Sequence, residues 1–328
     1  MVLVPFADDL HCHLRQGEMM GLVTRYIRQG GCDRVLVMPN TIPPITSCAQ
    51  AGEYRRQLLD IEPDVSFLMT LYLSHEISIA DLRENAKSNY VQGSLEEFYP
   101  IFSEMEKLGL SLHVHGEKPG ESPLHAEEKF ITNLENVARA FPRLKVVAEH
   151  VSTKACIEAV ERTPNLAATI TAHHLFITVN DVLNKTDNIT LDNINEHIKD
   201  PHLYCKPLAK TEEDREALRE VIKTRSKKFF LGSDSAPHTI FSKQSENPPA
   251  GVFTQPFLMN YLATIFKEMG CMDYLEDFTS KNGAEFLGLQ PKEIKWMKVL
   301  DESFTLPNTI EDMLVPFMAG QNVTKIDN

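Results

Sequence analysis

The chain has 328 residues and a hydrophobic content of 42%, which suits one large α/β domain or two smaller ones with a sizeable core. Its formal net charge of −13 argues against a general affinity for nucleic acid or anionic membranes. The six cysteines form no CxxC pair, and no apolar run reaches the roughly 18 residues of a membrane span, so we expect a soluble, cytoplasmic protein without a disulfide framework.

In the first part of the chain, strand-like apolar runs alternate with amphipathic helix-like segments. The expected strands are residues 2–10, 34–38, 65–73 and the short run 90–92. The expected helices are residues 19–28, 49–59, 79–87 and 95–108. Ser94 and Glu97 have the spacing of a capping box for the last of these helices, and Gly109 would end it.

The alternation continues toward the C-terminus. The expected strands are residues 110–115, 144–150, 166–171 and 228–231. The expected helices are residues 126–140, 154–162, 212–224, 257–269 and 274–287. Eight short strands separated by helices predict a parallel (β/α)8 TIM barrel over residues 1–328, a single domain with a C-terminal helical extension. An open doubly wound sheet is the alternative, but no glycine-rich nucleotide turn follows the first strand.

The first strand ends in a pair of histidines that suits a metal ion. His11 and His13 are two residues apart, so on an extended strand they face the same side. Two imidazoles on one face can bind a divalent ion, and zinc is the usual choice for nitrogen ligands. Arg15 would lie on the same side and offers a fixed cation with a bidentate fork for a carboxylate. Such a histidine pair alone is weak evidence, because it also occurs in ordinary buried strands.

Further polar residues fall at the carboxyl ends of the predicted strands, where barrel enzymes carry their working groups. They are Asn40, His115, His150 and Asp234. The last three also have ordinary structural interpretations: a hydrogen-bonded core histidine for His115, a neighbour of a helix cap for His150, and an aspartate in a Gly-Ser-Asp-Ser turn for Asp234. His173 and His174 also follow a strand, but Leu175 and Phe176 make packing or a substrate wall equally good interpretations.

Taken together, four imidazoles and one aspartate are the ligand inventory of a binuclear metal hydrolase. Two ions would activate water and polarise the carbonyl that it attacks. Asp234 would serve as both ligand and proton carrier, moving a proton to the leaving nitrogen. Arg15, Asn40 and His238 would hold an anionic small-molecule substrate.

Seven segments in order carry a resemblance to a known family: D-x-H-x-H-L-R, V-M-P-N-T-x-P-P, V-H-G-E, A-E-H-V-S-T, T-A-H-H-L, Y-C-K-P and G-S-D-S-A-P-H. The chain resembles the stand-alone dihydroorotases of bacteria and fungi, within the amidohydrolase superfamily, over nearly its whole length. The resemblance implies a barrel of the metal-dependent hydrolase type and the reversible cyclisation of N-carbamoyl-L-aspartate to L-dihydroorotate in pyrimidine biosynthesis. It also implies a homodimer.

The resemblance assigns roles residue by residue. His11, His13 and Asp234 would hold one zinc ion, and His115 and His150 would hold a second. Arg15, Asn40 and His238 would bind the carboxylate and ring of the substrate. Backbone groups near Lys206, Ala250 and Gly251 would contact the pyrimidine ring, although a main-chain contact makes the transfer to Lys206 less secure.

One expected element has no counterpart in the sequence. The family carries a carboxylated lysine that bridges both metals at the end of strand four, followed by a threonine-rich loop, and both would fall between Gly93 and Ser94. Either the segment is deleted, leaving two dications with less compensating charge, or the printed sequence omits residues of the natural chain. We favour omission, because a barrel missing a strand end would be strained, and it predicts a gap at this junction far beyond one peptide bond.

Two other functions remain open from the residues. A hydantoinase or allantoinase would use the same metal chemistry, although Arg15 and the segment from Ser235 to His238 favour a substrate with an α-carboxylate. A catalytically weak or silent scaffold is the alternative from a different class. Such a protein would be expected to lack metal ligands, whereas all five expected ligands remain here.

Overall fold

The computed structural model describes residues 2–74, 88–91 and 95–327. Its centre is a ring of short parallel strands, whose neighbours pair in chain order. The strands are β2 (Ala7–Cys12), β3 (Cys32–Val37), β4 (Ser66–Met69), β5 (Leu71–Leu73), β6 (Ser88–Val91), β7 (Ser111–Val114), β8 (Lys145–Ala148), β9 (Leu166–Ile170) and β10 (Phe229–Leu231). Parallel strands of this length bury both faces, which is why they read as short apolar runs.

Two junctions connect the hydrogen-bonded groups of parallel strands into one ring. Strands β4 and β5 are one chain segment interrupted at Thr70, whose hydroxyl donates to the carbonyl of Val37 at 2.6 Å. Near the carboxyl ends of β10 and β2, the amide of Asp234 donates to the carbonyl of His11 at 2.8 Å, and the amide of His13 donates to the carbonyl of Ser235 at 3.0 Å. Counting β4 and β5 as one position, the parallel strands occupy eight positions, so the predicted α/β barrel is confirmed.

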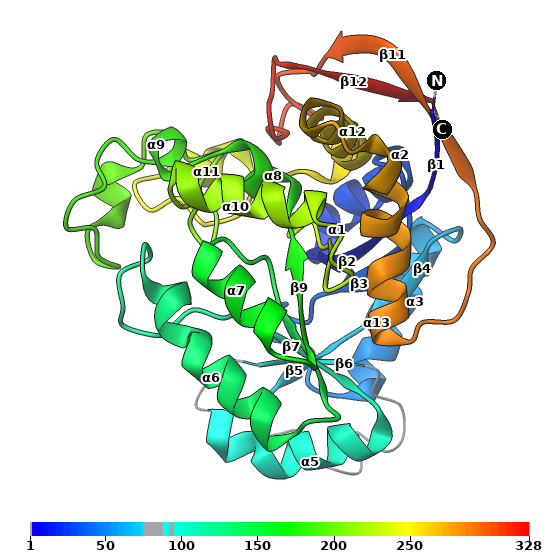
Figure 1. Ribbon diagram of the computed structural model, residues 1–328. Helices are drawn as coiled ribbons and strands as arrows, with labels where there is room; N and C mark the ends of the chain where they lie inside the picture. Colours follow the sequence, from blue (N-terminus) through cyan, green and yellow to red (C-terminus); the bar gives the residue numbers. More distant parts are fainter. Residues whose placement is uncertain (1, 75–87, 92–94, 328) are drawn as a thin grey trace.

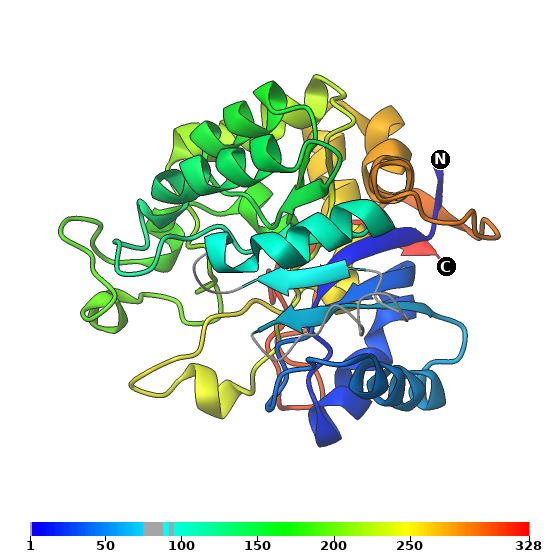
Figure 2. The ribbon, with the colours of Figure 1, turned by 90° about the horizontal axis from the view of Figure 1, so that it is seen from below.

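Helices cover the outside of the ring, and several match the predicted ranges closely (Figure 1). In Figures 1 and 2, the cyan and green helices α5 (Tyr99–Leu108), α6 (Ala126–Ala140) and α7 (Lys154–Arg162) lie along β7, β8 and β9. The other longer helices are α1 (Gly17–Thr24), α3 (Cys48–Ile61), α10 (Glu212–Lys223) and α12 (Leu258–Met269). Shorter helical segments are α2 (Tyr26–Gln29), α8 (Ala172–Phe176), α9 (Val179–Val182), η2 (Ile194–His197), α11 (Ile240–Lys243) and η3 (Gln255–Phe257). No helix in the described ranges combines the length and apolarity needed to cross a bilayer.

Two predicted elements are divided in the structure. The strand predicted over 2–10 splits at Phe6 into β1 (Val2–Pro5) and β2, and β1 leaves the barrel for another sheet. The helix predicted over 95–108 is a 3-10 turn, η1 (Leu95–Phe98), followed by α5. Pro100 lies in the first turn of α5, where its missing N–H costs nothing.

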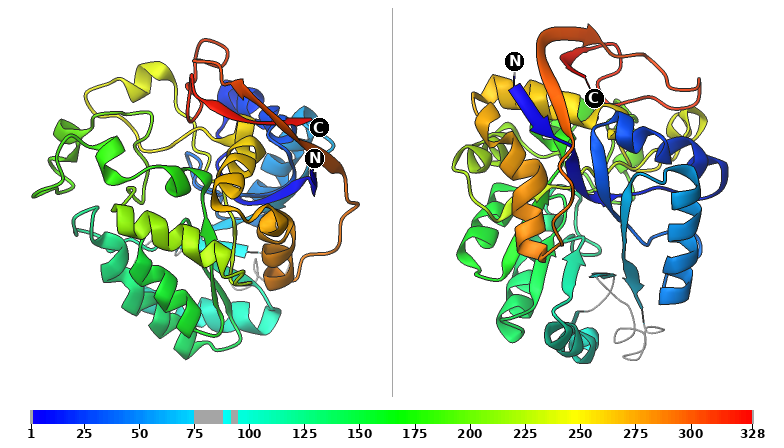
Figure 3. Two further views of the ribbon diagram at one scale, coloured as in Figure 1. Left: turned by 45° about the horizontal axis from the view of Figure 1, so that its top comes forward. Right: turned by 90° about the vertical axis from the view of Figure 1, so that its right-hand side faces the viewer.

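The C-terminal region contains strands that the sequence patterns did not indicate. β11 (Trp296–Thr305) and β12 (Asn322–Asp327) pair antiparallel with each other, and β11 pairs with β1, which brings the two ends of the chain together (Figure 3). The helix predicted over 274–287 is interrupted, with η4 (Met272–Tyr274), a π-helical turn η5 (Asp277–Lys281) and α13 (Asn282–Leu287). The assignment of residues 1–328 to one domain stays a prediction.

The region around the fourth strand is described only in part. β6 lies between β5 and β7, where residues 90–92 were expected to pair, and its sequence Ser-Asn-Tyr-Val contains no lysine. The helix expected over 79–87, the cap at Ser94 and the junction between Gly93 and Ser94 lie outside the described residues.

Candidate metal and substrate site

Three of the expected ligands meet where β2 ends and the chain leaves β10. Nε2 of His13 lies 3.0 Å from Oδ1 of Asp234, and Nε2 of His11 lies 3.5 Å from the same oxygen. One ligand atom from each of the three side chains falls within 4.8 Å of the others, a spacing that fits a single divalent ion. The two crossing backbone hydrogen bonds between these segments fix this arrangement, although the residues are more than two hundred positions apart in sequence.

The backbone is strained at three of the predicted site residues. Arg15, His150 and Asp234 have φ values of 59°, 40° and 45°, in the left-handed region that side chains usually avoid. Each follows the end of a barrel strand, where the chain must turn while its side chain stays at the mouth. Outliers of this kind tend to gather at functional sites, where surrounding contacts hold them in place.

His115 and His150 form a second pair beside the first cluster. Nδ1 of His115 lies 3.1 Å from Nε2 of His150, a separation suited to two nitrogens on one tetrahedral ion. The ring centroid of His150 lies 4.9 Å from that of His11, so residues from β2, β7, β8 and β10 converge at one end of the ring. Nε2 of His115 faces the carboxylate of Glu117 at 2.8 Å, which would orient the imidazole.

Beneath these ligands lies a buried network centred on Glu149. Its carboxylate bonds His113, receives the Thr169 hydroxyl at 2.6 Å and lies 2.8 Å from Nδ1 of His11. Burial lowers the pKa of His11, but Glu149 and Asp234 outweigh it and raise the pKa to about 10. Burial likewise opposes ionisation of Glu149, yet His11 and His113 hold its pKa below the usual range. Groups that favour a proton on His11 to this degree would also favour a metal cation in its place.

The electrostatics of the neighbouring groups also favour a bound metal cation. Burial raises the pKa of Asp234, but hydrogen bonds from His11 and His13 outweigh it and hold the pKa well below the usual range. Burial lowers the pKa of His13 and takes that of His150 well below its usual value, so both imidazoles are neutral, the form that binds metals.

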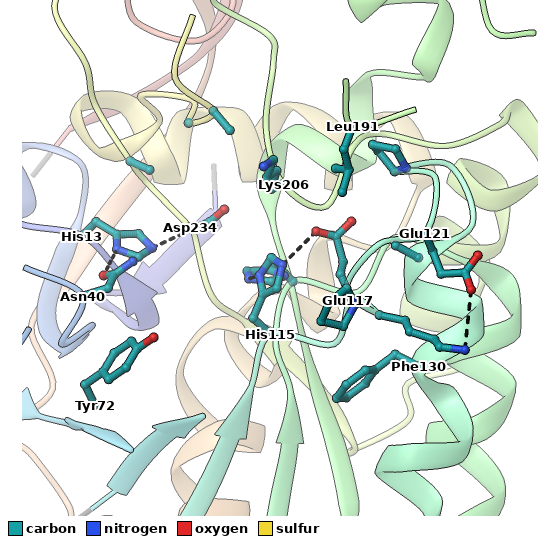
Figure 4. A pocket seen from close by; sticks show the side chains of 18 of the residues that line it. His13, Asn40, Tyr72, His115, Glu117, Glu121, Phe130, Leu191, Lys206 and Asp234 are labelled. Carbon is teal, nitrogen blue, oxygen red and sulfur yellow. Dashed lines mark hydrogen bonds and ion pairs between the residues drawn. The ribbon is translucent and has the colours of Figure 1, made fainter. Parts of the chain in front are cut away.

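A cavity of about 490 Å³ opens over these side chains (Figure 4). His13, Asn40 and Asp234 lie on one side of it and His115 and Glu117 on the other, with Lys206 above them in this view. Nδ1 of His13 bonds Oδ1 of Asn40 at 2.7 Å. The volume suits a small cyclic molecule.

The expected substrate residues line this space or its edge. Arg15, Lys206, Ala250 and Gly251 border the cavity, and His238 lies in the adjoining one. Nε of Arg15 donates to the carbonyl of Pro237 at 2.9 Å, and its Nη2 lies 3.0 Å from Nε2 of His238. Burial and the charge of Arg15 lower the pKa of His238 to about 3, so this imidazole is neutral.

His173 and His174 do not line the cavity. Both are buried on α8, where their ligand atoms gather with that of Cys205. His174 bonds the Thr171 hydroxyl and the carbonyl of Pro207, which is the contact of a packing residue.

Known proteins resemble this chain over nearly its whole length. The chain is 38% identical to a probable dihydroorotase of Schizosaccharomyces pombe, with 96% of this chain and 95% of the relative covered. The chain belongs to the dihydroorotase family. The amidohydrolase family pattern matches residues 82–243.

Solved structures of the family superpose over almost the whole chain. The dihydroorotase of Saccharomyces cerevisiae in complex with 5-fluoroorotic acid has a TM-score of 0.90 and 30% identity, covering 99% of this chain and 98% of its own. The dihydroorotase of Campylobacter jejuni has a TM-score of 0.88 and 31% identity, covering 100% and 97%.

The two groups of expected ligands differ in the number of donors that they offer to a metal ion. His11, His13 and Asp234 offer three ligands for one ion, whereas the pair of His115 and His150 offers two for another.

Sequence patterns did not single out Tyr72 or Leu191, which also line the cavity. Tyr72 lies on β5 in a run of apolar residues, so no neighbouring polar residue distinguishes it from an ordinary strand position. Glu117 stood in the V-H-G-E segment, and its spacing of two from His115 is the signal that could have assigned it an orienting role.

Proposed function

We propose that this protein is a zinc-dependent dihydroorotase that interconverts N-carbamoyl-L-aspartate and L-dihydroorotate in pyrimidine biosynthesis. The main supporting observation is that Arg15 lines one cavity of about 490 Å³ together with His13 and Asp234, two members of the three-ligand cluster. In the described part of the chain, no carboxylate forms an ion pair with Arg15, so its charge is available to a substrate carboxylate.

The chain's own groups account for binding and proton transfer. Arg15, held by Pro237 and His238, would grip the substrate carboxylate, while Asn40 and His13 border its other side. In the hydrolytic direction, Asp234 takes a proton from the attacking water and passes it to the ring nitrogen as the C–N bond breaks. In cyclisation the same carboxylate returns that proton.

The residues that would hold zinc are His11, His13 and Asp234 for one ion and His115 and His150 for a second. Bound zinc would polarise the scissile carbonyl and lower the pKa of water. The bridging lysine of the family remains unassigned in this chain, so we propose that the first site binds its ion more tightly than the second.

The decisive experiment is an assay of dihydroorotate, hydantoin and allantoin with protein whose zinc content is measured. Turnover of dihydroorotate alone supports the proposal. Preference for hydantoin or allantoin would instead support another cyclic amidase. A zinc-loaded protein that is inert toward all three would indicate a catalytically silent scaffold.

Arg15→Met should raise the KM for both anionic substrates by about a hundredfold, because a charge-assisted bidentate contact is lost. The rate constant kcat should fall less, since Arg15 does not carry the transferred proton. Steady-state kinetics in both directions measure the two effects. The exposed Arg56 on α3 offers a matched control, and Arg56→Met should leave KM unchanged. An unaltered KM in Arg15→Met would remove the residue from the substrate site.

We further propose a cytoplasmic location and a homodimer. The net charge of −13 and the scattered cysteines support the location, and the family resemblance supports the dimer. Sedimentation equilibrium of the purified protein would measure its association state.

A further inference from the structure

Lys243, at the end of the short helix α11, is a buried cation that donates hydrogen bonds to three carbonyl groups. Its side chain is only 2% exposed. Nζ donates to the carbonyls of Gly251 at 2.7 Å, Pro249 at 3.0 Å and Tyr204 at 3.2 Å. These bonds use all three ammonium hydrogens. Within the described ranges no carboxylate forms an ion pair with Lys243, so these three carbonyls are its direct partners, and the carboxylate of Asp200 acts on its charge only from a distance.

The three carbonyls belong to the two loops that border the substrate side of the cavity. Tyr204 precedes Lys206, and Pro249 and Gly251 flank Ala250; Lys206, Ala250 and Gly251 line the cavity. The amide of Gly251 also donates to the carbonyl of Tyr204 at 2.8 Å. The Tyr204 carbonyl therefore accepts from both the Lys243 ammonium and the Gly251 amide, which ties the two loops together at one point.

The charge of Lys243 also reaches the anion-binding corner. It helps to keep the pKa of His238 low, after burial and Arg15, and its own pKa is lowered by burial to about 8. The half-buried Arg15 and the buried Lys243 thus both contribute positive potential to a corner where His238 is neutral. Burying a cation without a carboxylate is costly, and an anionic ligand would offset that cost.

We propose that Lys243 is a positioning residue for the anionic end of the substrate, fixing the 204–206 and 249–251 loops and adding positive potential beside Arg15. This inference rests on the proposed function, because it takes a carboxylated pyrimidine as the ligand. Lys243 touches neither reacting atoms nor the expected metal ligands, so it should act on binding rather than on the chemical step.

Lys228 is the matched control. It also donates to three carbonyls, those of Val160 at 2.8 Å, Glu161 at 3.4 Å and Thr163 at 2.7 Å, but it precedes β10 at the end of the barrel opposite the cavity. Lys228→Met should lower thermal stability while leaving KM unchanged.

The experiment compares Lys243→Met, Lys243→Gln and Lys228→Met by steady-state kinetics and by hydrogen exchange at the Gly251 amide. Lys243→Met should raise KM about tenfold with kcat within about twofold, a loss comparable to one charge-assisted hydrogen bond. Gly251 should exchange about tenfold faster. Lys243→Gln keeps two donors without the charge, so it should restore slow exchange in part but not the KM.

Normal KM in both Lys243 variants, or exchange at Gly251 as slow as in the wild type, would overturn the proposal. An equal rise in KM from Lys228→Met would also overturn it, because the effect would then reflect general destabilisation. If the wild type turns over no substrate, the proposed function fails, whereas the exchange measurement still decides whether Lys243 fixes the loops.

Discussion

Replacing Asp234 by asparagine should abolish turnover in both directions, with kcat reduced about a thousandfold or more. The amide has nearly the same shape and can still lie beside His11 and His13, but it cannot accept and return a proton. Zinc content should fall without disappearing, since the histidine ligands remain. Initial rates from either substrate, together with elemental analysis, measure both effects.

Asp33→Asn provides the comparison. Asp33 lies on β3 at the opposite end from the cavity, where its carboxylate pairs with Lys292. Its loss should lower the free energy of unfolding while the rate stays near that of the wild type. An Asp234→Asn enzyme that retains a tenth of the wild-type kcat would refute the proton-carrier role.

Glu127→Ala should destabilise the protein by about 3 kcal/mol or more, because it leaves several buried donors without an acceptor. The Glu127 carboxylate on α6 is 3% exposed. It accepts hydrogen bonds from the amides of Ser152 and Thr153 at 2.8–3.1 Å and from both hydroxyls at 2.6 Å. Chemical denaturation followed by circular dichroism gives the free energy of unfolding.

The same carboxylate should influence the metal site. Ser152 lies two residues beyond His150, so loosening the 151–153 segment should also weaken zinc binding at the pair of His115 and His150. The neighbouring Glu128 is exposed, and Glu128→Ala should change neither property by a measurable amount. Equal stability of the two variants would show that the buried hydrogen bonds contribute little.

The sequence predicted the barrel architecture better than the boundaries of the individual elements. Helices α6 and α7 have the predicted ends because strong amphipathic patterns and, for α7, the Thr153 cap mark them locally. The residues brought together around His11 and Asp234 were recognisable because each polar side chain interrupts an apolar strand at its end. Their distances follow from barrel closure, which no local pattern encodes.

The elements that were not foreseen depend on distant partners. β11 mixes charged residues, such as the exposed Asp301 and Glu302, with a few apolar ones, so its pairing with β1 becomes evident only once the chain is folded. No local sequence signal marks Glu127, which stands beside Glu128 at the start of a helix. No local signal marks Lys243 either, and only its three carbonyl partners in the folded chain explain its burial.

The left-handed backbone at Arg15, His150 and Asp234 has a consequence for how this protein can evolve. Each such conformation costs roughly 1 kcal/mol or more relative to glycine. Selection for heat tolerance alone would therefore favour glycine at these three positions, and each such replacement would remove a residue that we propose as the substrate cation, a metal ligand or the proton carrier. Substitutions that raise thermal stability and preserve activity must therefore lie elsewhere, such as on the outer helices, where no such trade-off applies.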